Sequence, residues 1–432
     1  MRAEEPVRTE ERHHTVRIRT ITVLGAAGAL ATGLAACGSR DSSGIGGGKV
    51  AGTNLTIYSS LPLKGASHDE SQAIINGERL ALDSVGGKVG KFKIKYVSLD
   101  DSTAQNPDSA DGSQTQLNVS KATHDKSTIF YLGEFDSSGT KTSLRLLNQA
   151  GIPQISPSNT YVGLTTDEPG SEPGEPQKYY PTQKRTYARV VPRDTIQAAA
   201  DVSSMKEDGC KVVDVWNDQT IYGAGIAQNV RRSLKEQGIK QGNVQGTDRD
   251  APNYRAQASS ARGDCFFWGG VTAENGVQVY KDVAAANKAA KLYGPDGVVT
   301  EAFTNPKKGG IPASIAPRVK ITVPIVGVKD LPAAGPVLDK YKQKYSVPTV
   351  DPYGIYGYET MALALDVLKR AGAQANTREA VLKALFATKD RKSVLGTYSI
   401  DKRGDTTLRD YGLYTIKNGL PTYQKKIVAQ TK

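Results

Sequence analysis

The 432-residue sequence predicts an α/β protein built of two doubly wound, parallel-sheet lobes. Short apolar runs alternate with longer amphipathic patterns, as expected where strands alternate with helices. This rhythm runs through the first part of the chain and starts again near Val212. A chain of this length also exceeds what one hydrophobic core normally serves, so two domains are expected.

The N-terminal segment predicts an exported lipoprotein. Arg17 and Arg19 precede an apolar run, residues 21–36, that is short for a transmembrane helix and typical of a signal peptide. The run ends in Leu-Ala-Ala before Cys37, which fits a lipobox. We therefore expect residues 1–36 to be removed and the Cys37 thiol to carry a diacylglyceryl group with fatty acids such as palmitate. This anchor would hold the protein on the extracytoplasmic face of the cell membrane. The alternative is a plain signal peptide with a cysteine near its cleavage site.

Residues 37–52 are rich in Gly and Ser and predict a flexible tether. The elements of a first lobe follow it. Gly86 and Gly87 stop the first of its helices. The predicted strands are 55–59, 92–99, 128–132 and 153–156, and the predicted helices are 70–85 and 139–150.

A second lobe is predicted from the same alternation further along the chain. Its strands are expected at 212–216, 266–268 and 292–293, and its helices at 224–237 and 274–284. Between the two lobes, residues 165–185 are dense in Pro, Gly, Glu and Lys. This composition predicts a surface loop rather than a folded element.

Composition and motifs argue for binding rather than catalysis. The net charge is +12, but Lys and Arg are spread along the chain, so no concentrated basic face indicates a nucleic-acid partner. Only His68 and His124 follow the signal peptide, too few for a histidine-rich metal site. No HExxH, GxSxG or phosphate-loop pattern occurs. We therefore predict no catalytic residue, no metal and no cofactor.

Cys210 and Cys265 form an even pair once Cys37 carries lipid. Each lies before or at the start of a predicted strand, and neighbouring strands would bring the two within disulfide reach in an oxidising compartment. We predict a disulfide, with two free buried thiols as the alternative.

Polar residues gather where two predicted strands of the first lobe end. The first set is the turn Gly133–Gly139, which leads into a helix, and the second is Ser156–Thr160. Free backbone amides and hydroxyl groups at such strand ends suit a ligand carboxylate. Each segment alone is equally compatible with an ordinary helix cap or turn.

Taken together, these segments resemble the leucine-isoleucine-valine-binding family of periplasmic-binding proteins, which have the type I fold. The resemblance covers essentially the whole chain beyond the tether. It is carried by Asn76–Glu78, Ser98–Asp101, Gly133–Gly139, Gly151–Pro157, Tyr222–Gly225, Gly269–Gly270 and Tyr293–Gly297.

The resemblance implies a receptor whose two lobes close on a solute by a hinge and hand it to an ABC transporter permease. Residues 53–191 and 324–409 would form the first lobe, and residues 192–323 and 410–432 the second. The chain would cross between them near Arg189–Val191, Ile321–Val323 and Asp410.

The resemblance also assigns roles to individual residues. Ser137, Ser158 and Thr160 would bind the α-carboxylate of an amino acid, helped by backbone amides near Asn159. Asp296 would face the α-ammonium, because a carboxylate is its natural partner in a closed cleft. Tyr222 would cover the ligand from the second lobe, and Tyr353 would line the side-chain pocket. The sequence departs from the family pattern at 67–70, where a binding aromatic is often found, and at 271–272, where Tyr is common.

The expected ligand is an amino acid, with the branched-chain amino acids as first candidates. Three alternatives stay open: a sensor of the same fold that reports to a signalling partner, a receptor for an amide or a small peptide, and an exported enzyme. The sequence does not separate the first two from a transport receptor.

Overall fold

The computed structural model describes residues 48–429, so the predicted signal peptide and Cys37 lie outside the described residues. The first of its two large sheets has six strands in the order β2-β3-β1-β4-β5-β6. All neighbours in this sheet pair in parallel except β2 with β3. The strands are β1 (Asn54–Leu61), β2 (Lys88–Val89), β3 (Phe92–Asp100), β4 (Thr128–Gly133), β5 (Gln154–Ser156) and β6 (Tyr187–Arg189).

The second sheet has seven strands in the order β15-β14-β11-β10-β9-β7-β8, and its five strands from β11 to β8 are parallel. The last two strands of the chain, β14 and β15, add to it in antiparallel fashion. The strands are β7 (Val212–Asn217), β8 (Lys240–Gly246), β9 (Cys265–Gly269), β10 (Lys291–Gly294), β11 (Val319–Val323), β14 (Asp410–Lys417) and β15 (Leu420–Val428). A separate hairpin joins β12 (Arg391–Ser393) to β13 (Gly396–Tyr398).

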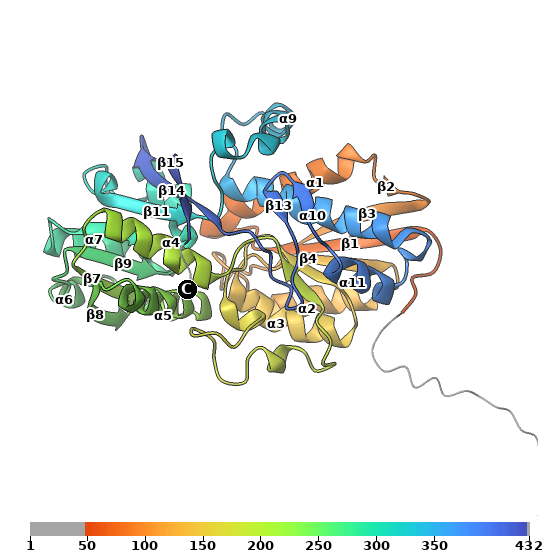
Figure 1. The fold of residues 1–432 in the computed structure, drawn as a ribbon, viewed down its shortest axis with the longest axis horizontal. Coiled ribbons are helices and arrows are strands. Elements are labelled where there is room, and N and C mark those ends of the chain that lie inside the picture. The colour runs from red at the N-terminus through yellow and green to blue at the C-terminus, as the bar shows by residue number, and fades with distance from the viewer. Residues whose placement is uncertain (1–47, 430–432) are drawn as a thin grey trace, which may run out of the picture. The chain divides into compact units, whose positions relative to one another are not determined.

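Helices cover both sheets. The helices are α1 (His68–Ser84), α2 (Gly112–His124), α3 (Ser137–Gln149), α4 (Asp194–Glu207), α5 (Ile221–Glu236), α6 (Arg255–Ala258), α7 (Gly276–Ala286), α8 (Glu301–Thr304), α9 (Gly335–Tyr345), α10 (Pro352–Ala371) and α11 (Arg378–Phe386). Figure 1 shows α10 and α11, drawn in blue, beside the orange strands β1 and β3. The chain therefore returns to the first lobe after building most of the second. The predicted fold, two doubly wound α/β lobes, is confirmed, while the exact lobe boundaries stay a prediction.

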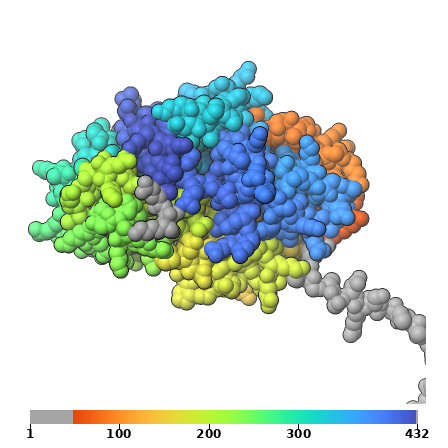
Figure 2. Space-filling model, viewed as in Figure 1, coloured from red at the N-terminus to blue at the C-terminus, as the bar shows by residue number. Residues whose placement is uncertain are grey.

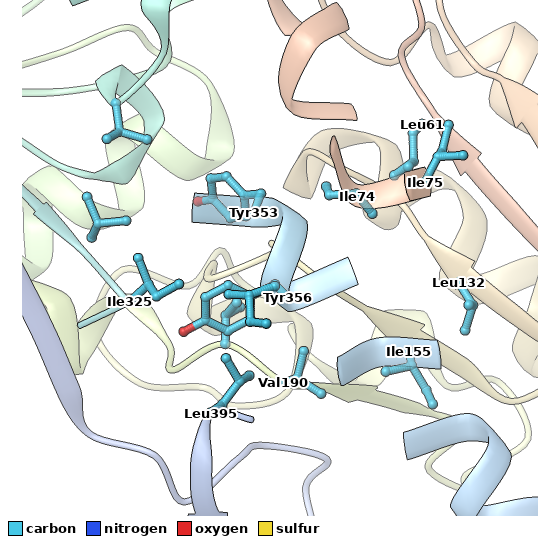
Figure 3. Close-up of a cluster of buried hydrophobic side chains, with 14 of the residues drawn as sticks. Leu61, Ile74, Ile75, Leu132, Ile155, Val190, Ile325, Tyr353, Tyr356 and Leu395 are labelled. Carbon is cyan, nitrogen blue, oxygen red and sulfur yellow. The ribbon is translucent and has the colours of Figure 1, made fainter. Parts of the chain in front are cut away.

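The close return of α10 depends on two glycines. A side chain at Gly77 of α1 would meet the Gly354 carbonyl oxygen at 2.0 Å, and one at Gly357 of α10 would meet the Ile74 carbonyl oxygen at 2.2 Å. The two helices consequently pack backbone to backbone. Figure 3 shows Ile74 and Ile75 of α1 near Tyr353 of α10, in a buried cluster that extends to Val190 and Ile325.

The three segments that connect the lobes lie together. Arg189, at the end of β6, donates its backbone amide to the Gly404 carbonyl at 3.0 Å. The hydroxyl of Tyr411 donates to the Pro192 carbonyl at 3.1 Å, and the hydroxyl of Tyr356 donates to the carbonyl of Pro324. In the space-filling view, late parts of the chain (blue) adjoin both the green and the yellow parts (Figure 2). This grouping of connections is what a hinge requires.

The predicted boundary of the tether, residues 37–52, lies too late, because Val50 already belongs to the folded part of the chain. Val50 is buried, its amide donates to the Asn376 carbonyl at 2.7 Å, and the Asn376 side chain donates back to the Val50 carbonyl at 2.8 Å. Composition alone does not predict this contact, because it depends on one apolar residue and two hydrogen bonds to the backbone of that residue.

The segment 165–185 is a loop with many exposed residues, as its composition predicts, but part of it packs against the lobe. It has little regular secondary structure, but Glu175, Tyr179 and Tyr180 are buried. Glu175 accepts a hydrogen bond from the Tyr161 hydroxyl at 2.7 Å and another from the Tyr179 hydroxyl. The tyrosines pack with Leu144 of α3. Proline and glycine prevent a helix or strand here, while the aromatic side chains still fold the segment onto the lobe.

The structure contains the predicted disulfide between Cys210 and Cys265, whose Cα atoms are 5.8 Å apart. It joins Cys210, two residues before β7, to Cys265 at the start of β9, the neighbour of β7 in the sheet. Replacing both cysteines by serine should lower the free energy of unfolding by about 2–4 kcal/mol, because the bond closes a long loop in the unfolded chain. Urea unfolding of the variant and the oxidised wild type measures this loss. An unchanged midpoint would show that the bond contributes no stability.

Glu78 of α1 makes stability depend on pH. Burial raises the pKa of its carboxyl to about 8, although the Tyr96 hydroxyl donates to it. The unfolded chain has an ordinary pKa near 4.3 and gives up the proton first as pH rises. The free energy of unfolding should therefore fall between about pH 4.5 and pH 8, on the order of 1 kcal/mol or more from this group. Unfolding curves at pH 5.5 and 8 should differ less in Glu78→Gln, and equal pH dependence in both proteins would contradict this origin.

None of the helices within residues 48–429 combines the length and the apolar character needed to cross a membrane.

Candidate ligand-binding site

A cavity lies between the lobes at the carboxyl ends of the strands. In the first sheet the strand order reverses between β1 and β4, and in the second between β7 and β9. Doubly wound sheets leave a crevice at such points. The segments that follow these four strands all line one cavity, with about 750 Å³ of empty space including its open mouth. The strand order thus brings the crevices of the two sheets together in one cavity.

All seven residues that the sequence analysis assigns to the ligand line this cavity: Ser137, Ser158, Asn159, Thr160, Tyr222, Asp296 and Tyr353. Ligand contact by each of them stays a prediction.

On the first lobe, the free polar groups belong to the start of α3 and the turn after β5. Asp136 caps α3 by accepting from the Gly139 amide at 2.7 Å, which leaves Ser137 in the first helical turn. Within the described chain no protein group is hydrogen-bonded to the Ser137 amide or hydroxyl, or to the Thr160 amide. A helix N-terminus with free N–H groups favours an anion. This wall can therefore hold a carboxylate without a cationic side chain.

The expected help from backbone amides near Asn159 is only partly available. The amides of Ser158 and Asn159 both donate to the Ser156 hydroxyl oxygen, at 3.2 and 3.0 Å. The Asn159 side chain donates to the Glu134 carbonyl at 3.1 Å, and the Ser158 hydroxyl donates to the Phe135 carbonyl at 2.6 Å. These hydrogen bonds hold the shape of the turn. Because both amides already donate to the Ser156 hydroxyl, they are less available to a ligand.

On the second lobe, Asp296 is the central acid. It follows β10 in a short 3-10 turn, and the residue is only 2% exposed. Its carboxylate accepts from the Tyr222 hydroxyl at 2.7 Å and from the Tyr353 hydroxyl. A carboxylate has about four acceptor positions, and the two tyrosine hydroxyls take two of them. Burial raises the pKa of Asp296, although the hydrogen bonds from Tyr353 and Tyr222 oppose the shift.

Two contacts join the lobes across the cavity. Tyr353 begins α10, which packs on the first lobe, so its hydrogen bond to Asp296 spans the cleft. Lys308 of the second lobe forms an ion pair with Asp69 at the start of α1, with Nζ and Oδ2 3.1 Å apart. The structure therefore has the two lobes closed on the cavity.

Several lining residues were not predicted as ligand residues, among them Glu70, Phe135, Asp136, Thr220, Thr272 and Glu274. Phe135 packs edge-on against Tyr353, with ring centroids 5.9 Å apart. Glu70 and Thr272 lie at the two places where the sequence departs from the family pattern, so those departures were the available signal. Within residues 48–429, no group of three or more His, Cys, Asp or Glu side chains could hold a metal ion.

The fold and the site define a two-lobed binding protein with a candidate ligand cavity between its lobes. Residues 57–420 match the family described as periplasmic binding protein, and the chain belongs to this family. Since the family consists of binding proteins, the prediction that the chain is not an enzyme is confirmed.

Individual relatives agree with this assignment. The chain is 26% identical over 296 residues to a Leu/Ile/Val-binding protein homolog of Brucella melitensis, covering 67% of this chain and 72% of that protein. The leucine-binding protein LivK from Thermotoga maritima superimposes with a TM-score of 0.73 at 20% identity, covering 86% of this chain and 98% of that one. An ABC transporter solute-binding protein from Rhodopseudomonas palustris, in complex with p-hydroxybenzoic acid, superimposes with a TM-score of 0.71 at 14% identity. The superposition covers 88% of this chain and 98% of that one.

Proposed function

We propose that the protein is an extracytoplasmic solute-binding receptor that captures an α-amino acid between its lobes and delivers it to an ABC transporter permease. One observation carries the proposal. The buried carboxylate of Asp296 on the second lobe lines the same cavity as the Ser137 hydroxyl and the amides of Ser137 and Thr160 on the first lobe. An α-amino acid carries an ammonium and a carboxylate on one carbon, so it matches both walls at once.

The names of sequence relatives support an amino-acid ligand. Leu/Ile/Val-binding protein homologs from Brucella and a leucine-, isoleucine-, valine-, threonine- and alanine-binding protein from Pseudomonas aeruginosa are among them. Branched-chain amino acids are therefore the first ligands to test. A benzoate-type acid, as found with two fold neighbours, has no ammonium to pair with the Asp296 carboxylate.

Closure couples binding to transport. A ligand that contacts both lobes stabilises the closed form, which a permease can then distinguish from the empty one. The lipid at Cys37 and the adjoining tether would hold the receptor near the permease and raise its effective concentration. Mass spectrometry of the N-terminal peptide from the membrane fraction tests the anchor, and an unmodified Cys37 would contradict it.

Calorimetry tests the ligand class. The domain, with Cys37 replaced, is unfolded and refolded to remove any bound ligand, and then titrated with amino acids, small amides, short peptides and benzoates. We expect one-to-one binding of an amino acid. Binding of an amide, a peptide or a benzoate alone would replace the amino-acid proposal. A pulldown from membranes separates the transport receptor from the same-fold sensor, because the first should retain a permease and the second a signalling protein.

A further inference from the structure

The side chains that line the cavity include acidic groups but no basic ones. Four carboxyl side chains line it, those of Glu70, Asp136, Glu274 and Asp296, and the described residues lining it include no Lys, Arg or His. Three of the four already have partners. Asp136 caps α3, Glu274 pairs with Arg249 at 3.1 Å, and Asp296 accepts from two tyrosine hydroxyls. Glu70 alone among them is unmatched.

Glu70 is buried, and one of its two carboxyl oxygens has no partner among the described residues. The residue is 4% exposed, and its Oε1 atom has no hydrogen-bond partner in the described chain. Burial, and then the negative charges of Asp351, Asp296 and Asp69, raise the pKa of its carboxyl well above the usual value. A carboxyl in such surroundings is costly unless a cation or a hydrogen-bond donor meets it. The described residues around Glu70 supply neither to its Oε1 atom.

The position of Glu70 indicates which group of a ligand would pair with its carboxyl. It lies in the first turn of α1, on the first lobe, whereas Asp296 belongs to the second. The two acids act on different parts of a ligand, because Asp296 faces the α-ammonium in the proposed function. An apolar branched side chain would leave the Glu70 carboxyl buried and unpaired. A side chain that ends in an ammonium or a guanidinium would neutralise it.

We infer that the cavity selects an α-amino acid with a cationic side chain, whose charged end pairs with Glu70. This inference rests on the proposed function and narrows its ligand to a class different from that in the relatives' names. The carboxylate of such a ligand binds neutral donors at Ser137 and Thr160, so its two cationic groups face the two available carboxylates.

Matched ligands test the inference on the unaltered binding site. Lysine and norleucine differ at the end of the side chain by an ammonium, and arginine and citrulline by a guanidinium. The refolded domain should bind lysine or arginine at least about 100-fold more tightly than its neutral counterpart. Equal or tighter binding of norleucine, or of leucine, would overturn the inference while leaving an amino-acid receptor. Failure of every amino acid to bind folded protein would overturn the proposed function together with it.

Two variants test whether the selectivity for a cationic ligand comes from Glu70. Glu70→Gln should weaken the binding of the cationic ligand at least about 30-fold, with norleucine changed less than about threefold. Glu78→Gln is the matched control, since Glu78 is a buried acid of the same helix and does not line the cavity. It should leave both affinities unchanged. Equal losses in the two variants, or no loss in Glu70→Gln, would contradict the pairing with Glu70, and thermal unfolding verifies that both variants fold.

Discussion

Replacing Asp296 by alanine should weaken binding of the best amino-acid ligand by about 3–5 kcal/mol, which is at least about 100-fold. The ammonium of the ligand would enter a closed cavity and find no charge opposite it. The hydroxyls of Tyr222 and Tyr353 would also lose their common acceptor. Isothermal titration of wild type and variant measures the difference.

Two further variants separate charge from folding. Asp296→Asn keeps the shape of the side chain and an acceptor oxygen, so it should fold like the wild type and still lose most of the affinity. Asp282→Asn makes the same exchange at a buried acid of α7 that does not line the cavity. That control should bind normally. A loss below tenfold in Asp296→Ala would contradict the role assigned to the acid.

Replacing Arg189 by methionine should lower the free energy of unfolding by about 3–5 kcal/mol. The side chain is fully buried and donates through Nε to Asp405 at 2.7 Å. It also donates through Nη1 to the carbonyls of Asn159 and Tyr161, at 3.0 and 2.8 Å. Methionine fills similar space but leaves the Asp405 charge and both carbonyls without this donor. The site turn and two lobe connections would loosen together.

An exposed ion pair provides the comparison for Arg189. Arg232 and Glu236 form an i,i+4 pair on α5, with Nε and Oε1 2.8 Å apart. Arg232→Met should cost less than about 1 kcal/mol, because water screens both charges. Equilibrium urea unfolding measures both variants. Similar small losses would show that the buried network around Arg189 contributes no more than a surface pair.

Sequence patterns predict most strands of the two sheets but miss several near the sheet edges, among them β8 and β15. The run at 128–132 and that at 266–268 are fully buried, so hydrophobicity marks them clearly. Strand β8, Lys240–Gly246, lies at the edge of its sheet and contains a single apolar side chain. An edge strand buries little surface, and pairing with β7 rather than hydrophobicity positions it.

The candidate site, too, could be predicted only in part from the sequence. Turns at the ends of strands were predictable, because the carboxyl ends of parallel strands meet at one edge. The burial of Glu70 was not, since an acid in a first helical turn normally faces solvent and stabilises the helix dipole. Its surroundings include Asp296 and Asp351, which lie more than 200 residues away in the sequence. Only the tertiary structure brings these groups together.

The most direct test of the amino-acid receptor is a titration with three related molecules. The refolded domain is titrated with its best-bound amino acid, with the same molecule lacking the α-ammonium, and with the same molecule lacking the carboxylate. We expect one-to-one binding of the amino acid and a loss of affinity of at least about 100-fold for each analogue. An analogue without the α-ammonium that binds as tightly as the amino acid would contradict recognition by Asp296, and with it the proposed function.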